Sequence, residues 1–86
     1  MTDYTLVEFG KVHDYLTRCG IDCRTYCKTF LVNCYDKNGV VQSYYASTQT
    51  AIFRKGNEKT DEKRTVKDFP IQKFAYVCQH PGALNW

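Results

Sequence analysis

The sequence lacks the features that mark several large classes of protein. No apolar run approaches the ~20 residues that a membrane-spanning helix needs. The first ten residues, MTDYTLVEFG, have neither the basic start nor the long apolar core of a secretory signal. No internal repeat or low-complexity segment is present. These absences predict one domain, residues 1–86, that works in the cytoplasm and makes no contact with a membrane.

Catalytic motifs are also missing. The chain contains no GxSxG, GxGxxG, P-loop or HExxH pattern. Glu58, Asp61 and Glu62 form a carboxylate cluster, but lysines surround it and nothing there would desolvate it. His80 follows Cys78 by two residues, without the sharp turn or glycine-rich loop that would help it activate a nucleophile. We therefore expect no enzymatic activity and no cofactor.

The cysteines are odd in number, which argues against a disulfide framework. The five are Cys19, Cys23, Cys27, Cys34 and Cys78. An odd count in a chain with no secretory signal predicts reduced thiols. A Cys-x₃-Cys spacing is admissible for zinc, but in a strand Cys23 and Cys27 would lie about 13 Å apart at ~3.3 Å per residue. Because free cysteine also behaves as a small buried hydrophobe, we expect no metal site.

Aromatic residues are abundant, and they mark the part of the chain that forms the core. Seven tyrosines, five phenylalanines and one tryptophan bring the aromatic fraction to 15%, so substantial burial is available. Residues 29–55 hold three runs rich in β-branched and aromatic residues, separated by turn signals at residues 36–39 and 47–49. This pattern predicts a three-stranded antiparallel meander.

The sharper turn signal, Asp36-Lys37-Asn38-Gly39, fits two hairpins. Asn and Gly tolerate positive φ at little cost, so a two-residue turn on Asn38-Gly39 is possible. A longer turn closed by Gly39 in a bulge is equally consistent with the sequence. The two alternatives differ by one residue in register, which would move every following side chain to the other face of the sheet.

Helical patterns flank the meander on both sides. Thr5 and Glu8 form a capping box, apolar residues then recur at helical spacing, and Gly20 suits the C-terminal position, so we predict a helix over residues 6–19. A short strand over Tyr4–Phe9 is the rival interpretation. Residues 21–29 alternate in part and are consistent with one long first strand that reaches about Tyr35.

The C-terminal third begins with a segment, residues 56–64, that has no apolar residue and predicts a surface loop. Asp68 is placed to cap a second helix, with Pro70 in its first turn. An apolar stripe at helical spacing follows, formed by Ile71, Phe74, Ala75 and Cys78. A strand through Phe74–Cys78 is the alternative.

The predicted order is helix, three strands, helix, which is an α+β fold. A three-stranded sheet must bury one side to be stable, so both helices would cover the same face.

The excess of positive charge is confined to one segment. The net charge is +3, and residues 1–53 hold five basic and five acidic side chains, so the surplus belongs to residues 54–73. Such a patch meets nucleic acid or an acidic protein surface, or is simply a solvated loop. The basic candidates for contact are Arg54, Lys55, Lys63, Arg64 and Lys67.

The element order is similar to that of double-stranded RNA-binding domains, in which basic residues at the start of the last helix contact phosphates. Lys63, Arg64 and Lys67 precede the last predicted helix here, but the hairpin loop Lys37-Asn38-Gly39 lacks the proline and histidine of that family. The resemblance implies direct nucleic-acid binding through residues 54–67. We expect such binding to be weak, because carboxylates interrupt the segment.

A second resemblance is to a general type of small protein and does not rest on a sequence motif. The Lys37-Asn38-Gly39 hairpin, with Tyr44-Tyr45 and Thr50-Ala51-Ile52-Phe53 closing the sheet, looks like the small accessory proteins of phages and mobile elements, among them anti-CRISPR inhibitors. It implies a non-enzymatic protein that binds a host protein or nucleoprotein complex.

Aromatic side chains supply the candidate anchors for either function. For a protein partner we expect exposed aromatics at Tyr44, Tyr45 or Trp86, with the basic residues at the rim. For a single-stranded nucleic acid, a stacking face would use Tyr26, Tyr35, Tyr44 and Tyr45, about half of which we expect in the core.

Overall fold

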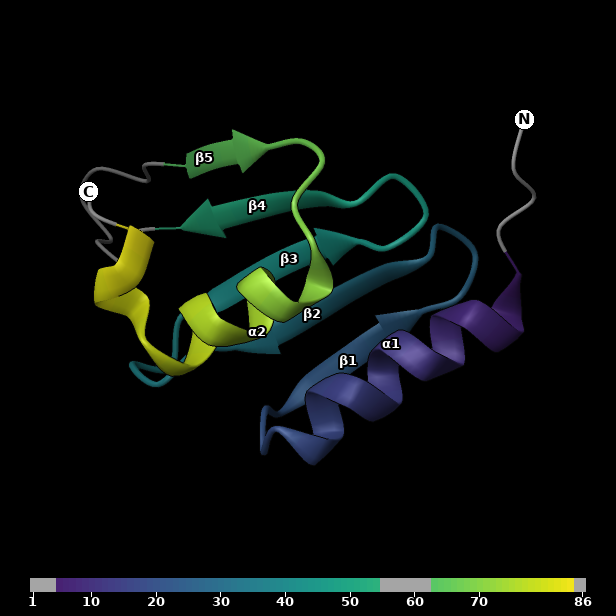
Figure 1. Ribbon diagram of the computed structural model, residues 1–86, viewed down its shortest axis with the longest axis horizontal. Helices are drawn as coiled ribbons and strands as arrows, with labels where there is room; N and C mark the ends of the chain where they lie inside the picture. Colours follow the sequence, from purple (N-terminus) through teal and green to yellow (C-terminus); the bar gives the residue numbers. More distant parts are fainter. Residues whose placement is uncertain (1–4, 55–62, 85–86) are drawn as a thin grey trace.

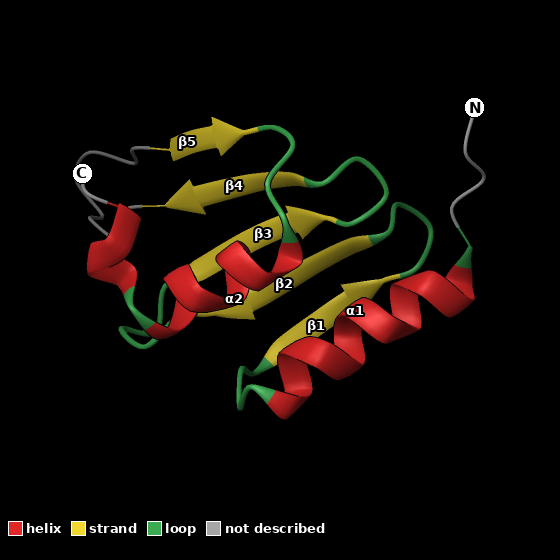
Figure 2. Cartoon of the chain, viewed as in Figure 1, coloured by secondary structure: helices red, strands yellow, loops and turns green. Residues whose placement is uncertain are grey.

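The computed structural model describes residues 5–54 and 63–84 and shows two helices on a five-stranded antiparallel sheet (Figures 1 and 2). The elements are α1 (Leu6–Arg18), β1 (Cys23–Tyr26), β2 (Leu31–Tyr35), β3 (Val41–Tyr45), β4 (Thr50–Arg54), β5 (Lys63–Val66), α2 (Ile71–Gln79) and the 3₁₀ helix η1 (Pro81–Leu84). The strands lie in sequence order, β1-β2-β3-β4-β5, and each is antiparallel to the next. The α+β class and the antiparallel sheet are confirmed, but the three-stranded meander understated the sheet.

The first additional strand comes from residues 21–29, where one long strand was the wrong interpretation. The chain reverses between β1 and β2, and Cys23 pairs with Cys34 while Tyr26 pairs with Leu31. The turn between them contains no Gly, Pro, Asn or Asp, the residues that normally signal a reversal. Phe30 adopts the left-handed conformation there, with φ 53°, and its ring packs edge-on against Phe9 at 5.6 Å. Tertiary packing therefore creates a turn that local composition does not indicate.

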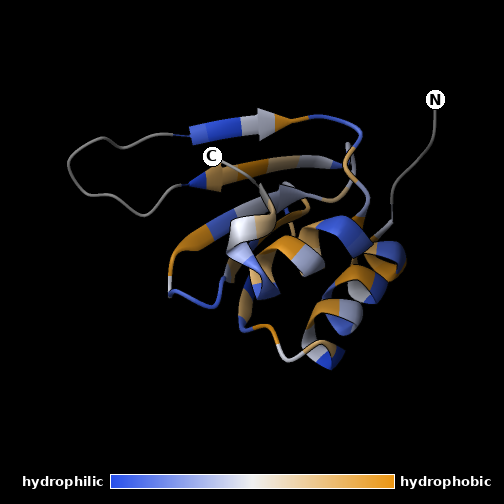
Figure 3. Cartoon of the chain, turned by 60° about the vertical axis from the view of Figure 1, so that its left-hand side comes forward, coloured by the Kyte–Doolittle hydropathy of each residue, from blue (hydrophilic) through white to orange (hydrophobic). Residues whose placement is uncertain are grey.

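The second additional strand is β5, where we predicted the end of a surface loop. Lys63–Val66 pairs with β4, with Val66 opposite Ala51 and Lys63 opposite Arg54. Three of its four side chains are exposed, and Figure 3 shows the hydrophilic character of its first residues. Charged residues are common on edge strands because they oppose pairing with other chains, and the same charges hide the strand from sequence patterns. Residues 56–62 of the predicted loop lie outside the described residues.

The hairpin between β2 and β3 follows the longer of the two predicted turns. The Gly39 N–H donates to the Asp36 carbonyl at 3.0 Å, and the Asp36 N–H donates to the Val40 carbonyl at 2.9 Å. Gly39 has φ 80°, as a bulge closed by glycine requires. The Asp36 carboxylate also accepts from the backbone N–H groups of Asn38 and Val40, both at 2.9 Å. This side chain therefore sets the register of β3.

Helix α1 begins and ends where the sequence predicted. The Glu8 N–H donates to Thr5 Oγ1 at 3.3 Å at its start, so the alternative strand over Tyr4–Phe9 is wrong. At its end Gly20 has φ 79°, and the N–H of Ile21 reaches back to the Leu16 carbonyl at 3.1 Å. These two features form a Schellman motif.

Helix α2 is also a helix rather than a strand, but its start differs from the prediction. Pro70 occupies the N-cap position, and no side chain caps the helix. Asp68 does not cap because it lies in the preceding connection, with φ 55°. The predicted apolar stripe faces the sheet, with Phe74, Ala75 and Cys78 buried.

The core lies between the helices and one face of the sheet, which we call the inner face. Its largest fully buried side chains are Tyr44, Phe53, Phe74, Leu16, Val32, Cys34 and Cys78. The Phe74 ring lies 4.9 Å from that of Tyr44 and 5.7 Å from that of Phe53, measured between centroids. Burying one such aromatic ring contributes about 1.5–3 kcal/mol. The same strands carry the opposite set of side chains away from the helices.

Candidate functional site

The face of the sheet that points away from α1 and α2 is the candidate binding site, and we call it the outer face. Side chains alternate along a strand, so the register assigns each residue to one face. The outer face consists of Arg24, Tyr26, Leu31, Asn33, Tyr35, Val41, Ser43, Tyr45, Thr50, Ile52, Arg54, Lys63 and Thr65. Both helices lie on the other side (Figure 1), and no element in the described part of the chain covers this surface.

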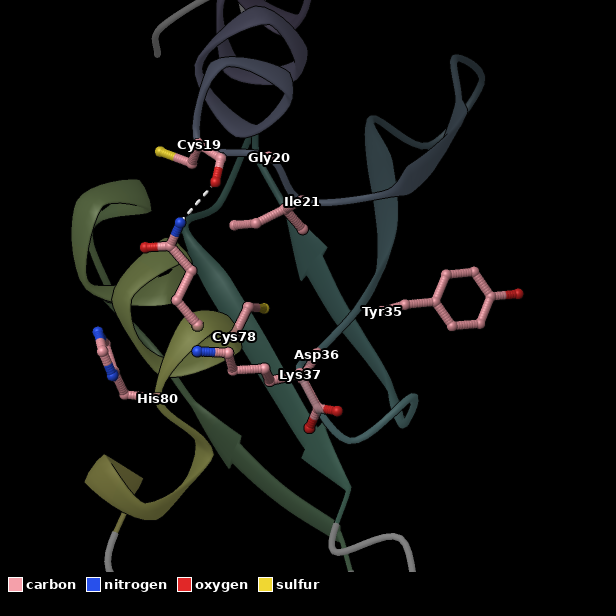
Figure 4. Close-up of a pocket in the computed structure, with 9 residues that line it drawn as sticks. Cys19, Gly20, Ile21, Tyr35, Asp36, Lys37, Cys78 and His80 are labelled. Carbon is pink, nitrogen blue, oxygen red and sulfur yellow. Dashed lines mark hydrogen bonds between the residues drawn. The ribbon is translucent and has the colours of Figure 1, made fainter.

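Tyrosines occupy two places on the outer face. Tyr26, Leu31 and Tyr45 form one cross-strand row, with Leu31 paired to both tyrosines. The two tyrosines are therefore separated by two strand spacings, about 10 Å. Tyr35 lies at the other end of β2, and Figure 4 shows its ring pointing away from the helices. Tyr26 is 46% exposed and Tyr35 is 40% exposed, so both rings are accessible to a partner.

A polar cluster holds the middle of the outer face in place. The Ser43 hydroxyl donates to Asn33 Oδ1 at 2.7 Å and accepts from Arg54 Nη1 at 2.9 Å. The same nitrogen of Arg54 donates to the Val41 carbonyl at 3.0 Å. A guanidinium has five N–H donors in a fixed plane. These bonds through one nitrogen hold the group against the sheet and fix where its charge lies.

The backbone that carries Arg54 is fixed from the inner face. The buried Gln42 amide accepts from the Arg54 N–H at 2.6 Å and donates to the Arg54 carbonyl at 3.0 Å. It also donates to the Asp36 carboxylate at 3.0 Å. Gln42 thus takes the place of ladder bonds where β3 begins and β4 ends. The β2–β3 turn and the Arg54 side chain are therefore linked through one buried amide.

The charge on the outer face is of one sign. Arg24, Arg54 and Lys63 carry it, and none of the other described residues assigned to this face is acidic. Arg54 and Lys63 are directly opposite one another on β4 and β5. Two carboxylates adjoin this face along the chain. That of Asp36, just after β2, is held by the turn and by Gln42. Asp22, just before β1, lies at the edge of the face opposite Tyr35, whose N–H donates to the Asp22 carbonyl at 2.9 Å. The face as a whole therefore favours a negatively charged ligand.

The structure distributes the predicted contact residues unevenly. It brings Tyr45, Arg54 and Lys63 together on the outer face. Tyr44 is a correction, because it is 1% exposed and its hydroxyl donates to the Phe69 carbonyl at 2.6 Å. Since neighbouring residues of a strand point to opposite faces, Tyr44 and Tyr45 cannot both face a partner.

The remaining predicted residues lie elsewhere. The register assigns Arg64 to the opposite face of β5, and the exposed Lys67 lies in the connection to α2. Lys55 and Trp86 are outside the described residues. The sequence pattern missed Arg24, whose place became visible only once β1 was known to pair with β2. Its alternation with Tyr26 was the available signal.

A pocket of about 440 Å³ lies on the other side of the molecule, between the ends of the two helices and the β2–β3 hairpin (Figure 4). The Gln79 amide crosses it to the Cys19 carbonyl, and the Lys37 N–H donates to the Cys78 carbonyl at 2.9 Å. The Asp36 carboxylate at its wall is occupied by the turn. The polar groups of this pocket therefore hold three elements together.

Cys78 and His80 do not form a nucleophile–base pair. The Cys78 thiol is buried and hydrogen-bonds to Cys34, while the His80 ring lies 4.6 Å from that of Tyr76. The hydrogen bond with Cys78 and burial raise the pKa of Cys34, and burial raises the pKa of Cys23. These pKa shifts keep the thiols of Cys34 and Cys23 neutral, which makes these two thiols poor nucleophiles.

Among residues 5–54 and 63–84, no group of three or more His, Cys, Asp or Glu side chains is arranged to hold a metal ion. Neither helix in these ranges is both long and apolar enough to cross a membrane.

Comparison with protein-family models, with curated proteins and with solved structures found no match to the chain.

Proposed function

We propose that this protein is a non-enzymatic binding or inhibitor protein that docks on a host protein or nucleoprotein complex through the outer face of its sheet. The observation that carries the proposal is that this face has no cover in the described structure, although it presents accessible tyrosine rings beside aliphatic side chains. Tyrosine and arginine are the residues that most often dominate binding energy at interfaces. Inhibition of a host defence complex, as the resemblance to phage accessory proteins implies, is one form of this function.

The outer face has the layout of a binding surface. Leu31, Val41 and Ile52 are half-buried. Leu31 lies between Tyr26 and Tyr45, and Val41 is paired with Tyr35. A face that combines tyrosine, aliphatic and arginine side chains resembles the composition of protein interfaces, where aromatic residues and arginine are enriched. Arg54 is already held by Ser43 and the Val41 carbonyl, so less side-chain entropy would be lost on binding.

The basic segment 54–67 supports direct nucleic-acid binding less well than its composition suggested. Its cations do not form one surface, because Arg54 and Lys63 point outward whereas Arg64 belongs to the other face of β5. The start of α2 lacks basic residues in its first turn apart from Lys73, which is its third residue. The layout of double-stranded RNA-binding domains is therefore not reproduced by the charges.

Site-specific photo-crosslinking tests the proposal. A photoreactive residue at Thr65, which is exposed on the outer face, should give discrete adducts of higher mass in host extract. The same residue at Gln72, exposed on α2, is the matched control and should give none. Adding Tyr45→Ala to the Thr65 probe should reduce the yield. Adducts that form from Gln72 but not from Thr65 would place the binding surface on the helices and contradict the proposal.

A further inference from the structure

We infer that the ligand contacted by the outer face is a single-stranded nucleic acid, with bases stacked on Tyr26 and Tyr45 and phosphates held by Arg24, Arg54 and Lys63. The inference rests on the proposed function, because it names the chemistry of the ligand for the same face. It differs from the layout-based expectation of duplex binding through residues 54–67. The proposed contact surface is the outer face of the sheet rather than the segment 54–67, and the proposed ligand has unpaired bases rather than a duplex.

The row Tyr26–Leu31–Tyr45 provides the places for bases. Its three side chains come from neighbouring strands and lie on the same face. Every base has a π-face, so aromatic rings on an open sheet bind single strands with little preference for sequence. The aliphatic Leu31 between the rings adds apolar contact without competing for the ligand. A strand crossing β1, β2 and β3 would therefore meet two rings in succession.

The cations lie to one side of this row and do not interrupt it. Arg24 is two residues before Tyr26 on β1, so both point outward about 7 Å apart along the strand. Arg54 and Lys63 face each other across β4 and β5, on the far side of the face. A line of cations beside a row of rings matches a single strand, whose phosphates lie along one side of its bases. A backbone that follows the three cations would have its bases over the tyrosines.

The position of Arg54 strengthens the argument. Its Nη1 bonds to Ser43 Oγ and to the Val41 carbonyl hold the guanidinium at a fixed place on the sheet. Gln42 holds its backbone from the other side. A cation held in place in this way, with other donors on the same group, suits a phosphate, which guanidinium groups bind through paired N–H donors. The chain thus positions a phosphate-binding group before any ligand arrives.

Duplexes and acidic protein surfaces fit this face less well. In a duplex the base faces are stacked on each other, so the tyrosines would have nothing to stack on. The outer face is a sheet surface, whereas major-groove readers insert a helix or a two-stranded ribbon. An acidic protein would satisfy the three cations, but it would not require a row of two tyrosine rings beside them. A single strand uses both the tyrosine rings and the three cations of the face.

Binding of labelled oligonucleotides to the full chain tests the inference. We expect oligo(dT) and oligo(U) of about 12 nucleotides, within the ~4–16 nucleotides of single-strand sites, to bind saturably in fluorescence anisotropy titrations. Tyr26→Ala and Tyr45→Ala should each weaken binding about 5- to 150-fold, the range that corresponds to loss of one stacked base. With three phosphate contacts, log K should fall against log salt with a slope of about −2.

Two controls separate stacking from other effects. Tyr76→Ala removes a tyrosine that is 56% exposed on α2, and it should leave binding unchanged. Tyr45→Phe keeps the ring and should retain most of the affinity, whereas a role for the hydroxyl would make it as weak as Tyr45→Ala. Lys63→Gln should lower the salt slope by about 0.7, the contribution of one phosphate contact.

The outcomes distinguish this inference from the proposed function. No saturable binding, a duplex bound as tightly as a single strand, or an equal loss in Tyr76→Ala would overturn the inference. If the oligonucleotides fail while a probe at Thr65 captures a protein that Tyr45→Ala releases, the partner is a protein and the proposed function stands. If the adduct from Thr65 disappears after nuclease treatment, the inference is supported in the native setting.

Discussion

The two faces of the sheet arise from the same short strands, yet they differ in almost every property. In β3 the buried Tyr44 packs against Phe74, while Tyr45 beside it belongs to the outer face. The inner face carries the apolar core, and both helices pack on it. The outer face mixes rings, aliphatic side chains and cations, and it stays open. The difference shows that burial, rather than residue type, separates the tyrosines that stabilise the fold from those available for binding.

Truncating the inner face should have the largest effect on stability. Phe74 is fully buried, and its ring contacts those of Tyr44 and Phe53. We expect Phe74→Ala to lower the free energy of unfolding by about 3–5 kcal/mol, because it leaves a cavity. Tyr26→Ala on the outer face should cost less than about 1 kcal/mol. Urea denaturation of both variants makes the comparison, and equal losses would mean that the outer face is buried. If Phe74→Ala does not fold, Phe74→Leu provides the smaller step.

Replacing the buried Gln42 amide, which links the two faces, should have the second-largest effect on stability. Gln42→Met conserves volume but removes the hydrogen bonds of the Gln42 amide to the Asp36 carboxylate and to the N–H and carbonyl of Arg54. We expect a loss of about 2–3 kcal/mol, since unsatisfied buried polar groups are costly. Gln72→Met, at an exposed position of α2, is the matched control and should be nearly neutral. Chemical denaturation measures both, and a neutral Gln42→Met would show that water replaces the amide.

Substitution of Gly39, in the turn that sets the register, should have the third-largest effect on stability. Gly39 has φ 80°, and open space surrounds the position of an added Cβ, so the cost of substitution is conformational. Gly39→Val should destabilise by about 1–2 kcal/mol, because a β-branched residue resists positive φ. Gly39→Asn should be tolerated better. Because a slip of one residue would exchange the faces, increased reactivity of Cys34 toward thiol reagents in the valine variant would reveal a changed register.

The smallest effect should appear only at alkaline pH. The hydrogen bond with Cys78 and burial raise the pKa of Cys34 above its ordinary value, so the folded state keeps a proton that the unfolded chain releases. Stability from this thiol is fully present below pH ~8.5 and declines as pH rises. Between pH 8 and 9.5 we expect a loss of about 1 kcal/mol. The decline should be shallower in Cys34→Ala, and parallel curves for the two proteins would contradict the assignment.

Thiol labelling offers a check on the same comparison at neutral pH. Cys27 is exposed in the β1–β2 turn, whereas Cys34 and Cys78 are buried in the core. Peptide mapping after brief treatment with a thiol reagent should find Cys27 modified first and Cys34 last. Preferential labelling of Cys34 would mean that the inner face opens readily.

Much of the fold could be predicted because its signals are local. Thr5 and Gly20 mark the ends of α1 by hydrogen bonds within a few residues of themselves. The stripe on α2 and the two predicted turns are local in the same sense. The sequence did not predict β1 and β5 as separate strands, because pairing with a neighbouring strand rather than their composition makes them strands. The turn at Phe30, stabilised by a ring from α1, carries no local signal at all.

The candidate site was only partly predictable for the same reason. Tyr45, Arg54 and Lys63 were expected to make contacts, but nothing local showed that the last two face each other across β4 and β5. Tyr26 was a candidate for a stacking face, but Arg24 became part of the site only when the structure showed that the chain reverses between residues 26 and 31. Tyr44 is not part of the candidate site, because the register turns its ring toward Phe74.

The sequence by itself determined the α+β class, the position of both helices and the location of the central hairpin. Capping, periodicity and the positive φ of glycine are properties of a few adjacent residues, so they act before any long-range contact forms. Tertiary structure decided how many strands the sheet has and which side chains share a face. Strand pairing joins residues far apart in the chain, and only the register of that pairing assigns a tyrosine to the core or to the surface.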